Sequence, residues 1–147
     1  MAPPDPATGG TPERPNFSCR FRVYWEDTDA GGVVYYANYL KFMERCRTDW
    51  LRELGIDQGQ LRRERQLQFA VANVNVSFLR PALLDDEITV TAALMRLGGA
   101  TMEFRQSVWR AGEQLAEAEV RIACIDAVSL KPRGVPKDMF MEWRNAG

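Results

Sequence analysis

The chain has 147 residues, of which 46% are hydrophobic and 27% charged, and its formal net charge is −1. This length suits one globular domain with a buried core, and the scattered Lys and Arg residues offer no basic stripe for nucleic acid. The sequence contains no histidine. This absence excludes Ser-His-Asp and Cys-His catalytic sites, histidine-ligated zinc and imidazole acid/base chemistry.

The start of the chain differs in composition from the rest. Residues 1–15 hold five of the eight prolines, which predicts a disordered N-terminal tail before a single domain over residues 16–147. This segment lacks the features of a signal peptide, and no run approaches the ~20 apolar residues of a membrane span. We therefore expect a cytoplasmic protein, in which the three widely spaced cysteines are reduced and buried.

The elements expected after the tail are a strand, a long helix and four more strands. Apolar residues alternate over residues 17–25, which predicts a half-buried strand, and recur every three or four positions over residues 37–54, which predicts a helix. Gly55 supplies a stop for this helix. Residues 57–65 are polar and basic and favour a further short helical turn.

The second half of the chain alternates in the period of strands. Apolar residues line one face over residues 70–78, 88–94, 102–108 and 116–124, with turns at 97–100 and 110–113. One strand, one helix and four consecutive strands favour an α+β domain with a five-stranded antiparallel sheet and the long helix against one face. A long strand at the sheet edge would allow pairing with another subunit, so we expect a homo-oligomer.

The loop between the first strand and the helix carries the candidate chemistry. Asp27 and Asp29 precede two glycines and a helix that begins near residues 36–38. Free amides at a helix N-terminus stabilise an anion, so they can polarise an acyl carbonyl while a carboxylate attacks directly or activates water. Taken alone, such a pattern more often forms a turn or a helix cap. A divalent cation would need more oxygen ligands than this loop offers.

Residues 23–44, VYWEDTDAGGVVYYANYLKFME, resemble the signature of the 4-hydroxybenzoyl-CoA thioesterase family, in particular its Tol-Pal-associated acyl-CoA thioesterase branch. The resemblance extends over about residues 17–137, and its further matching residues are Arg45, Arg47, Trp50, Leu51, Phe78–Ala82 and Asp85–Glu87. It implies a hot-dog fold, in which the sheet wraps the long helix. It also implies that two subunits join their sheets, with active sites at the interface, and that dimers often pair into tetramers.

The resemblance also implies an activity, the hydrolysis of a small or medium acyl-CoA, and the residues that perform it. Asp29 matches the catalytic aspartate, and the backbone of Tyr36 matches the helix-start amide that polarises the thioester carbonyl. Many relatives in this branch have histidine at the Tyr36 position, and a phenol is a poor base near neutral pH. The expected substrate contacts are Gly31, Val34, Tyr35, Arg80, Lys131 and Arg133. No resident cofactor or metal is expected, because coenzyme A is part of the substrate.

The remaining residues have plainer interpretations. Asp27 is expected to brace the loop and Asn38 the helix start, while Tyr35, Tyr39 and Trp50 are expected to pack in the core or an interface. Two other functions fit a hot-dog fold: a non-catalytic binding or scaffold protein associated with envelope or lipid-synthesis proteins, and a dehydratase. The dehydratase would normally use a histidine, which this chain lacks.

Overall fold

The computed structural model describes residues 15–141 and 143, so nearly all of the predicted tail over residues 1–15 lies outside the described residues. Two helices and five strands follow one another in the predicted order. Their bounds are β1 (Phe17–Arg22), α1 (Asn38–Glu53), α2 (Gln58–Arg65), β2 (Leu67–Phe78), β3 (Glu87–Leu97), β4 (Thr101–Arg110) and β5 (Glu113–Asp126). Two 3-10 turns, η2 (Trp25–Asp27) and η3 (Lys137–Phe140), complete the described elements.

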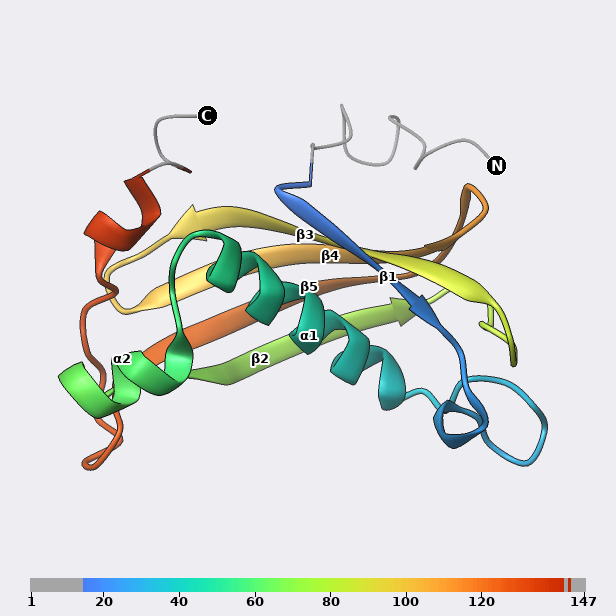
Figure 1. Ribbon diagram of the computed structural model, residues 1–147, viewed down its shortest axis with the longest axis horizontal. Helices are drawn as coiled ribbons and strands as arrows, with labels where there is room; N and C mark the ends of the chain where they lie inside the picture. Colours follow the sequence, from blue (N-terminus) through green and yellow to red (C-terminus); the bar gives the residue numbers. More distant parts are fainter. Residues whose placement is uncertain (1–14, 142, 144–147) are drawn as a thin grey trace.

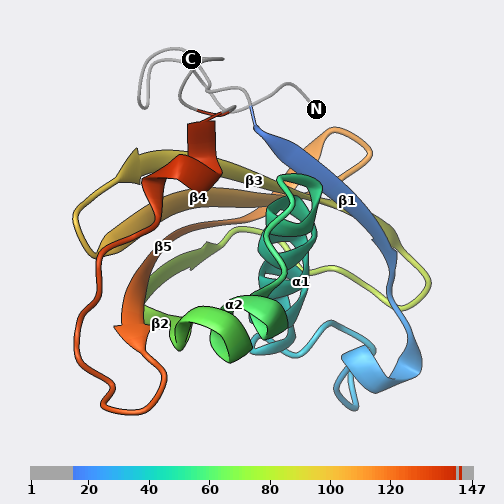
Figure 2. The ribbon, with the colours of Figure 1, turned by 60° about the vertical axis from the view of Figure 1, so that its left-hand side comes forward.

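The strands form one antiparallel sheet in the order β1-β3-β4-β5-β2. The long helix α1 lies across one face of this sheet (Figure 1). The turned view of Figure 2 shows that the strands curve around the helix. This is the hot-dog arrangement, so the predicted fold class is confirmed. β1 and β2 are the two edge strands, and β2 is 12 residues long.

The core lies between α1 and the concave face of the sheet. The helix buries an apolar stripe that includes Phe42, Met43 and Trp50, and these residues contact buried side chains of the sheet such as Phe104. Apolar residues at three- and four-residue spacing therefore place one helix face against the sheet. The helix ends as predicted, because Gly55 has φ +87°, a conformation that glycine adopts without steric cost.

A polar contact interrupts this apolar interface. Arg47 on α1 is only 8% exposed, and its Nη1 donates to Oε1 of the fully buried Gln106 on β4 at 2.8 Å. The Gln106 Nε2 in turn donates to the Met43 carbonyl on the helix (3.0 Å) and to the Thr91 carbonyl on β3 (3.2 Å). Burial lowers the pKa of Arg47. One amide side chain thus joins the helix to two strands.

Two strand predictions differ from the structure. The first strand ends at Arg22 instead of residue 25, because the Asp27 Oδ2 accepts the Tyr24 N–H (2.8 Å) and turns the chain into η2, where Trp25 is 74% exposed. In β2 a bulge between Val71 and Asn73 shifts the alternation, so residue 72, predicted to face inward, is exposed. A bulge places two residues opposite one and reverses the facing of the strand beyond it.

The three cysteines are free thiols, as predicted, but only Cys46 and Cys124 are buried as expected, whereas Cys19 is half-buried. Within the part of the chain that the structure describes, neither helix has the length and apolar character needed to cross a membrane.

Candidate active site

The acidic loop folds into a small hairpin. Thr28 and Val34 form an antiparallel bridge, and the Asp29 N–H donates to the Val33 carbonyl at 2.9 Å. The chain reverses at Gly32, whose φ of +79° favours glycine and whose N–H donates to the Asp29 carbonyl (3.0 Å). Asp29 therefore lies at the base of a tight, hydrogen-bonded turn.

The Asp29 carboxylate is held by one oxygen. Its Oδ1 accepts the Gly31 N–H at 2.8 Å, and a Cβ at position 31 would lie 3.3 Å from this oxygen. Among residues 15–141 and 143, no hydrogen bond reaches Oδ2, and the residue is exposed. The side chain is thus oriented through Oδ1 while Oδ2 stays accessible.

Asp27 connects the loop to both neighbouring elements, as predicted for a bracing residue. Besides its side-chain contact with Tyr24, its carbonyl oxygen accepts the Tyr35 N–H (3.0 Å) and the Asn38 Nδ2–H (2.8 Å). Asn38 is the first residue of α1. One peptide oxygen therefore fixes the acidic loop to the start of the helix.

Tyr36 lies just before this helix, since Ala37 is the N-cap and α1 begins at Asn38. The Tyr36 carbonyl accepts the Tyr39 N–H at 3.3 Å, whereas the Tyr36 N–H finds no acceptor among the described residues. Its side chain is 62% exposed and stacks at a tilt on Tyr35, with ring centroids 4.8 Å apart. The adjoining Tyr36 side chain raises the pKa of Tyr35. The backbone N–H is available to a ligand, as the orphan amides at helix starts are.

The connection between β2 and β3 is hydrogen-bonded to the acidic loop. The Val34 N–H donates to the Ala82 carbonyl (2.8 Å), and the Leu84 N–H donates to the Gly32 carbonyl (3.1 Å). The Ala82 N–H in turn donates to the hydroxyl of Tyr39 on α1 at 2.9 Å. The loop is therefore hydrogen-bonded to a segment some fifty residues later in the chain.

Arg110 holds the same connection in place. Its Nη1 donates to the Pro81 carbonyl (3.1 Å) and to the Asp86 Oδ2 (2.7 Å), and its Nη2 donates to the Glu113 Oε1 (2.6 Å). The hydrogen bonds to Asp86 and then to Glu113 raise the pKa of Arg110. The sequence did not predict this cluster. Arg110 stands alone in a predicted turn, Asp86 is far from it along the chain, and the spacing between Arg110 and Glu113 matches no recognised motif.

The other predicted substrate contacts are dispersed. Val34 is buried, so its side chain belongs to the core, while Gly31 and Tyr35 are exposed on the loop. Arg80 follows β2, and its Nε lies 3.3 Å from the Glu113 Oε2. Lys131 and Arg133 belong to the segment that follows β5 and bridges back to it through Pro132. This segment lies across the molecule from the acidic loop (Figure 1). One chain therefore does not bring these two cations to Asp29.

An exposed apolar surface adjoins the helix start. Tyr36 and Phe78 form an edge-on pair with centroids 6.2 Å apart, and Tyr35, Phe78 and Leu79 are each about half exposed. This surface lies at the end of the free edge strand β2. No group of three or more potential metal ligands occurs among the described residues.

A sheet wrapped around one helix, with an exposed carboxylate on a loop that is hydrogen-bonded to the helix start, defines a hot-dog protein with a candidate active site. Residues 31–117 match the family model described as Thioesterase superfamily. The chain belongs to this family of enzymes.

Individual relatives share most of the chain. It is 44% identical over 123 residues to the acyl-CoA thioesterase YbgC of Haemophilus influenzae, which covers 84% of this chain and 90% of that protein. A probable thioesterase from Bartonella henselae superposes with a TM-score of 0.78 at 37% identity, covering 82% of this chain and 99% of that one. A thioesterase from Thermus thermophilus, solved with coenzyme A and Zn, has a TM-score of 0.75 at 26% identity, covering 88% and 92%.

Proposed function

We propose that this protein hydrolyses the thioester of small or medium acyl-CoA molecules, with Asp29 as the catalytic carboxylate. The observation that carries the proposal is the pairing, on one braced loop, of an accessible Asp29 Oδ2 with a Tyr36 N–H that has no acceptor among the described residues. The names of the relatives at 41–44% identity, acyl-CoA thioesterase and acyl-CoA thioester hydrolase, support the choice of substrate.

The proposed chemistry needs only these two groups and water. The Tyr36 N–H donates to the thioester carbonyl oxygen and stabilises the negative charge that develops there. The Asp29 carboxylate either attacks the carbonyl carbon, expelling the coenzyme A thiolate and leaving an anhydride for water to cleave, or takes a proton from an attacking water. Single turnover in isotopically labelled water distinguishes the routes, because label in the Asp29 carboxylate indicates the anhydride.

A second copy of the chain completes the proposed site. The outer edge of β2 has no strand partner within residues 15–141 and 143, and an unpaired edge of this length favours pairing with another strand. Antiparallel pairing of two β2 strands would bring the start of one strand beside the end of the other. Because β2 begins opposite the end of β5, this pairing carries Lys131 and Arg133 of the second copy toward the exposed surface around Phe78 and Tyr36.

In this arrangement the exposed aromatic surface receives the acyl group, and the two cations contact the phosphates of coenzyme A. Phosphate groups attract Lys and Arg, and apolar surface attracts an acyl chain. The acyl group that fits depends on side chains from both copies. A cytoplasmic location remains the expectation from the sequence.

The test of the proposed function is hydrolysis of a panel of acyl-CoA thioesters by wild type and Asp29→Asn, followed through the released thiol. Loss of a base or nucleophile lowers kcat by about 10²–10⁴-fold, while circular dichroism and sedimentation should stay unchanged. Glu26→Gln, at an exposed neighbouring acid, is the matched control and should retain activity. Asp29→Asn with wild-type turnover on the best substrate refutes the assignment.

Tyr36→Phe separates the backbone from the side chain. We expect this variant to keep kcat within about threefold, because the amide that polarises the carbonyl is unchanged. A loss as large as that of Asp29→Asn would mean that the phenol itself takes part in the reaction.

A further inference from the structure

Two short segments lie side by side (Figure 1 and Figure 2), at the end of the molecule that is opposite the acidic loop in Figure 1. One is α2, and the other is the turn over residues 127–130, which follows β5. The Ala127 N–H joins them, because it donates to the Gln66 carbonyl directly after α2 at 2.7 Å. We call five exposed side chains of these segments the end patch: Arg62, Arg63 and Arg65 of α2, and Val128 and Leu130 of the turn.

The turn carries the apolar part of the end patch. Val128 is 77% exposed and Leu130 is 63% exposed, more than any other Val, Leu, Ile or Met among residues 15–141 and 143. Leu130 also has φ +63°, in the left-handed region that is unfavourable for a bulky residue. A strained backbone that leaves an apolar side chain in water favours a functional interpretation of this turn.

Asp126 holds the turn in one conformation. Its Oδ1 accepts the N–H groups of Val128 and Ser129, each at 2.9 Å, and its carbonyl accepts the Leu130 N–H at 2.8 Å. Its Oδ2 accepts a hydrogen bond from the Arg133 Nη1 at 3.0 Å. The hydrogen bonds from Ser129 and Val128 lower the pKa of Asp126, so this carboxylate is ionised at neutral pH. The turn is therefore pre-formed, and binding to it requires little further ordering.

Helix α2 carries the charged part of the end patch. It contains three arginines and one glutamate, which give it a net charge of +2, whereas the whole chain has a net charge of −1. The Glu64 Oε1 accepts the Gln60 Nε2–H at 3.1 Å, and none of the three guanidinium groups forms a hydrogen bond or ion pair with another described residue. Cations in the last turn of a helix interact favourably with its dipole, and three unpaired guanidinium groups also create a positive surface.

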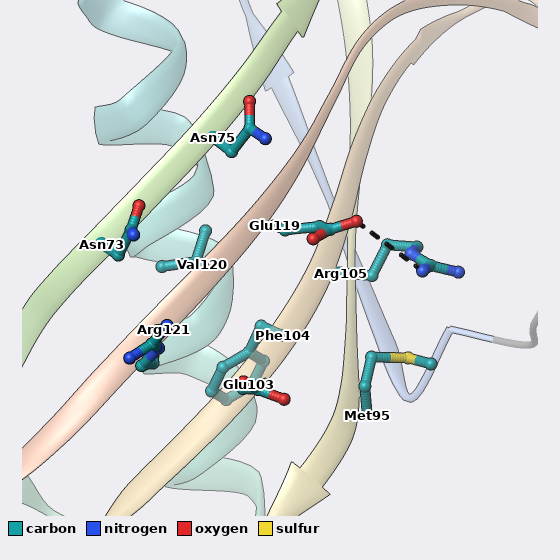
Figure 3. A pocket seen from close by; sticks show the side chains of 9 residues that line it. All are labelled: Asn73, Asn75, Met95, Glu103, Phe104, Arg105, Glu119, Val120 and Arg121. Atoms are coloured by element: carbon teal, nitrogen blue, oxygen red, sulfur yellow. Dashed lines mark ion pairs between the residues drawn. The ribbon is translucent and has the colours of Figure 1, made fainter.

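Positive charge is offset on the face of the sheet that is turned away from α1. Two arginines and two glutamates surround a hollow there (Figure 3). The Arg105 Nη2 lies 3.9 Å from the Glu119 Oε1. Arg121 pairs with Glu103 in the strand register. Opposite charges on that face offset one another, but those of the end patch do not, so an anionic surface is attracted to this end of the molecule.

We propose that the end patch docks this protein on the surface of a lipid bilayer that contains anionic headgroups. The three guanidinium groups lie among the headgroup phosphates, and Val128 and Leu130 enter the boundary between the headgroups and the acyl chains. Basic residues are attracted to an anionic leaflet, and apolar side chains gain favourable free energy by leaving water there. One partner thus satisfies both parts of the end patch.

A bilayer suits the end patch better than other polyanions do. A nucleic acid would bind the arginines through its phosphates but would leave the two aliphatic side chains in water. An acidic protein would need a surface shaped to the turn and its surroundings over about 800 Å². A fluid bilayer needs no complementary shape, so two protruding side chains are sufficient for insertion.

Membrane docking is independent of the proposed chemistry at Asp29 and compatible with the proposed pairing of β2. Pairing uses the outer edge of β2, whereas α2 ends before this strand begins and the turn lies on its other side, after β5. Lys131 and Arg133 are left out of the end patch, because they are proposed to contact coenzyme A.

Co-sedimentation of the full chain with lipid vesicles tests the proposal. Wild type should bind vesicles of phosphatidylglycerol and phosphatidylcholine in equal parts, and should bind vesicles of phosphatidylcholine alone more weakly by roughly 100-fold. Raising NaCl from about 50 to about 500 mM should release the protein from the anionic vesicles, because salt screens the cations. Circular dichroism without vesicles establishes that each variant keeps the wild-type fold.

Two variants remove the two parts of the end patch separately. Loss of the charged part should lower the partition coefficient on anionic vesicles by roughly 100-fold, because each basic residue near such a surface contributes about fivefold. Loss of the apolar part should lower it by at least about tenfold. Glycine at position 130 keeps the turn, since φ +63° suits it. The variants are Arg62→Gln with Arg63→Gln and Arg65→Gln, and Val128→Ser with Leu130→Gly.

Matched controls change the same number of residues elsewhere on the surface. Arg20→Gln with Arg96→Gln and Arg121→Gln removes three exposed cations from the sheet. Met95→Ser with Met141→Ser removes two exposed apolar side chains. Both controls should bind anionic vesicles within about fivefold of wild type, because the changed residues lie outside the end patch and salt screens their charges.

Two results would overturn the proposal. One is a wild type that binds anionic vesicles no more tightly than neutral ones, as a surface made for an acidic protein or a nucleic acid would do. The other is a pair of end-patch variants that bind as tightly as their controls. Asp29→Asn should bind vesicles like wild type, so vesicle binding and acyl-CoA hydrolysis test the two proposals separately.

Discussion

Replacing Tyr39 by phenylalanine removes one hydroxyl from the contact that joins α1 to the segment behind the acidic loop. That hydroxyl accepts the Ala82 N–H at 2.9 Å, with Ala82 fully buried and Tyr39 only 3% exposed. Burial raises the pKa of Tyr39, so the group is a neutral phenol at physiological pH. The ring of the variant fits the same space, and the change is confined to the hydrogen bond.

The expected loss of stability comes from the Ala82 N–H, which has no acceptor in the variant. A buried N–H without an acceptor destabilises a protein by about 1–3 kcal/mol, and water has no access to Ala82 to replace the hydroxyl. For a chain of this size, the loss corresponds to a decrease in Tm of roughly 3–9 °C. Urea unfolding at one fixed protein concentration measures the change, because self-association would otherwise contribute to apparent stability.

Tyr35→Phe is the matched control, since the Tyr35 side chain is 47% exposed and water can hydrate the groups around it. We expect this variant to lose less than about 0.5 kcal/mol. A Tyr39→Phe variant as stable as its control would refute the reasoning. It would mean that the Ala82 N–H finds another acceptor, or that its hydrogen bond contributes nothing to the stability of the protein.

Three further outcomes are expected. Arg110→Met should reduce stability by about 1–2 kcal/mol in urea, because two carboxylates and the Pro81 carbonyl lose a partly buried cation; an unchanged midpoint would contradict this. Burial raises the pKa of all three cysteines, most of all Cys46, so a thiol reagent at pH 8 should modify the native protein far more slowly than the urea-unfolded protein. Dialysis against a chelator should leave kcat unchanged, and activity restored only by added metal would contradict the proposed mechanism.

The spacing of apolar residues along the sequence was sufficient to predict the order of the helix and strands. Apolar residues every three or four positions located α1 to within one residue at each end, and Gly55 located its stop. The strands of the second half followed from alternation because one of their faces is buried against the helix. A period of two on one buried face and a period near 3.6 in one helix are signals that a single sequence carries.

What the sequence did not predict depends on contacts between distant segments. Nothing near Trp25 indicates that the Asp27 side chain turns the first strand into a 3-10 turn, and nothing near Asn73 signals the bulge in β2. The support of the acidic loop by Ala82 and Arg110 joins residues far apart in the chain. Alternation and spacing describe neighbours along the chain, so they cannot reveal which carbonyl a distant guanidinium binds.

The buried contact between Arg47 and Gln106 has a consequence for the far end of the helix. An apolar stripe alone would permit α1 to shift along the sheet by one turn, about 5.4 Å, with little loss of hydrophobic contact. Such a shift would leave the Arg47 guanidinium against apolar strand residues without its acceptor, which is strongly unfavourable. Only one position of α1 along the sheet is therefore low in energy. Because Tyr36 precedes Arg47 by about three turns, this single position also determines where the start of α1, and the acidic loop that is hydrogen-bonded to it through the Asp27 carbonyl, lie relative to the sheet.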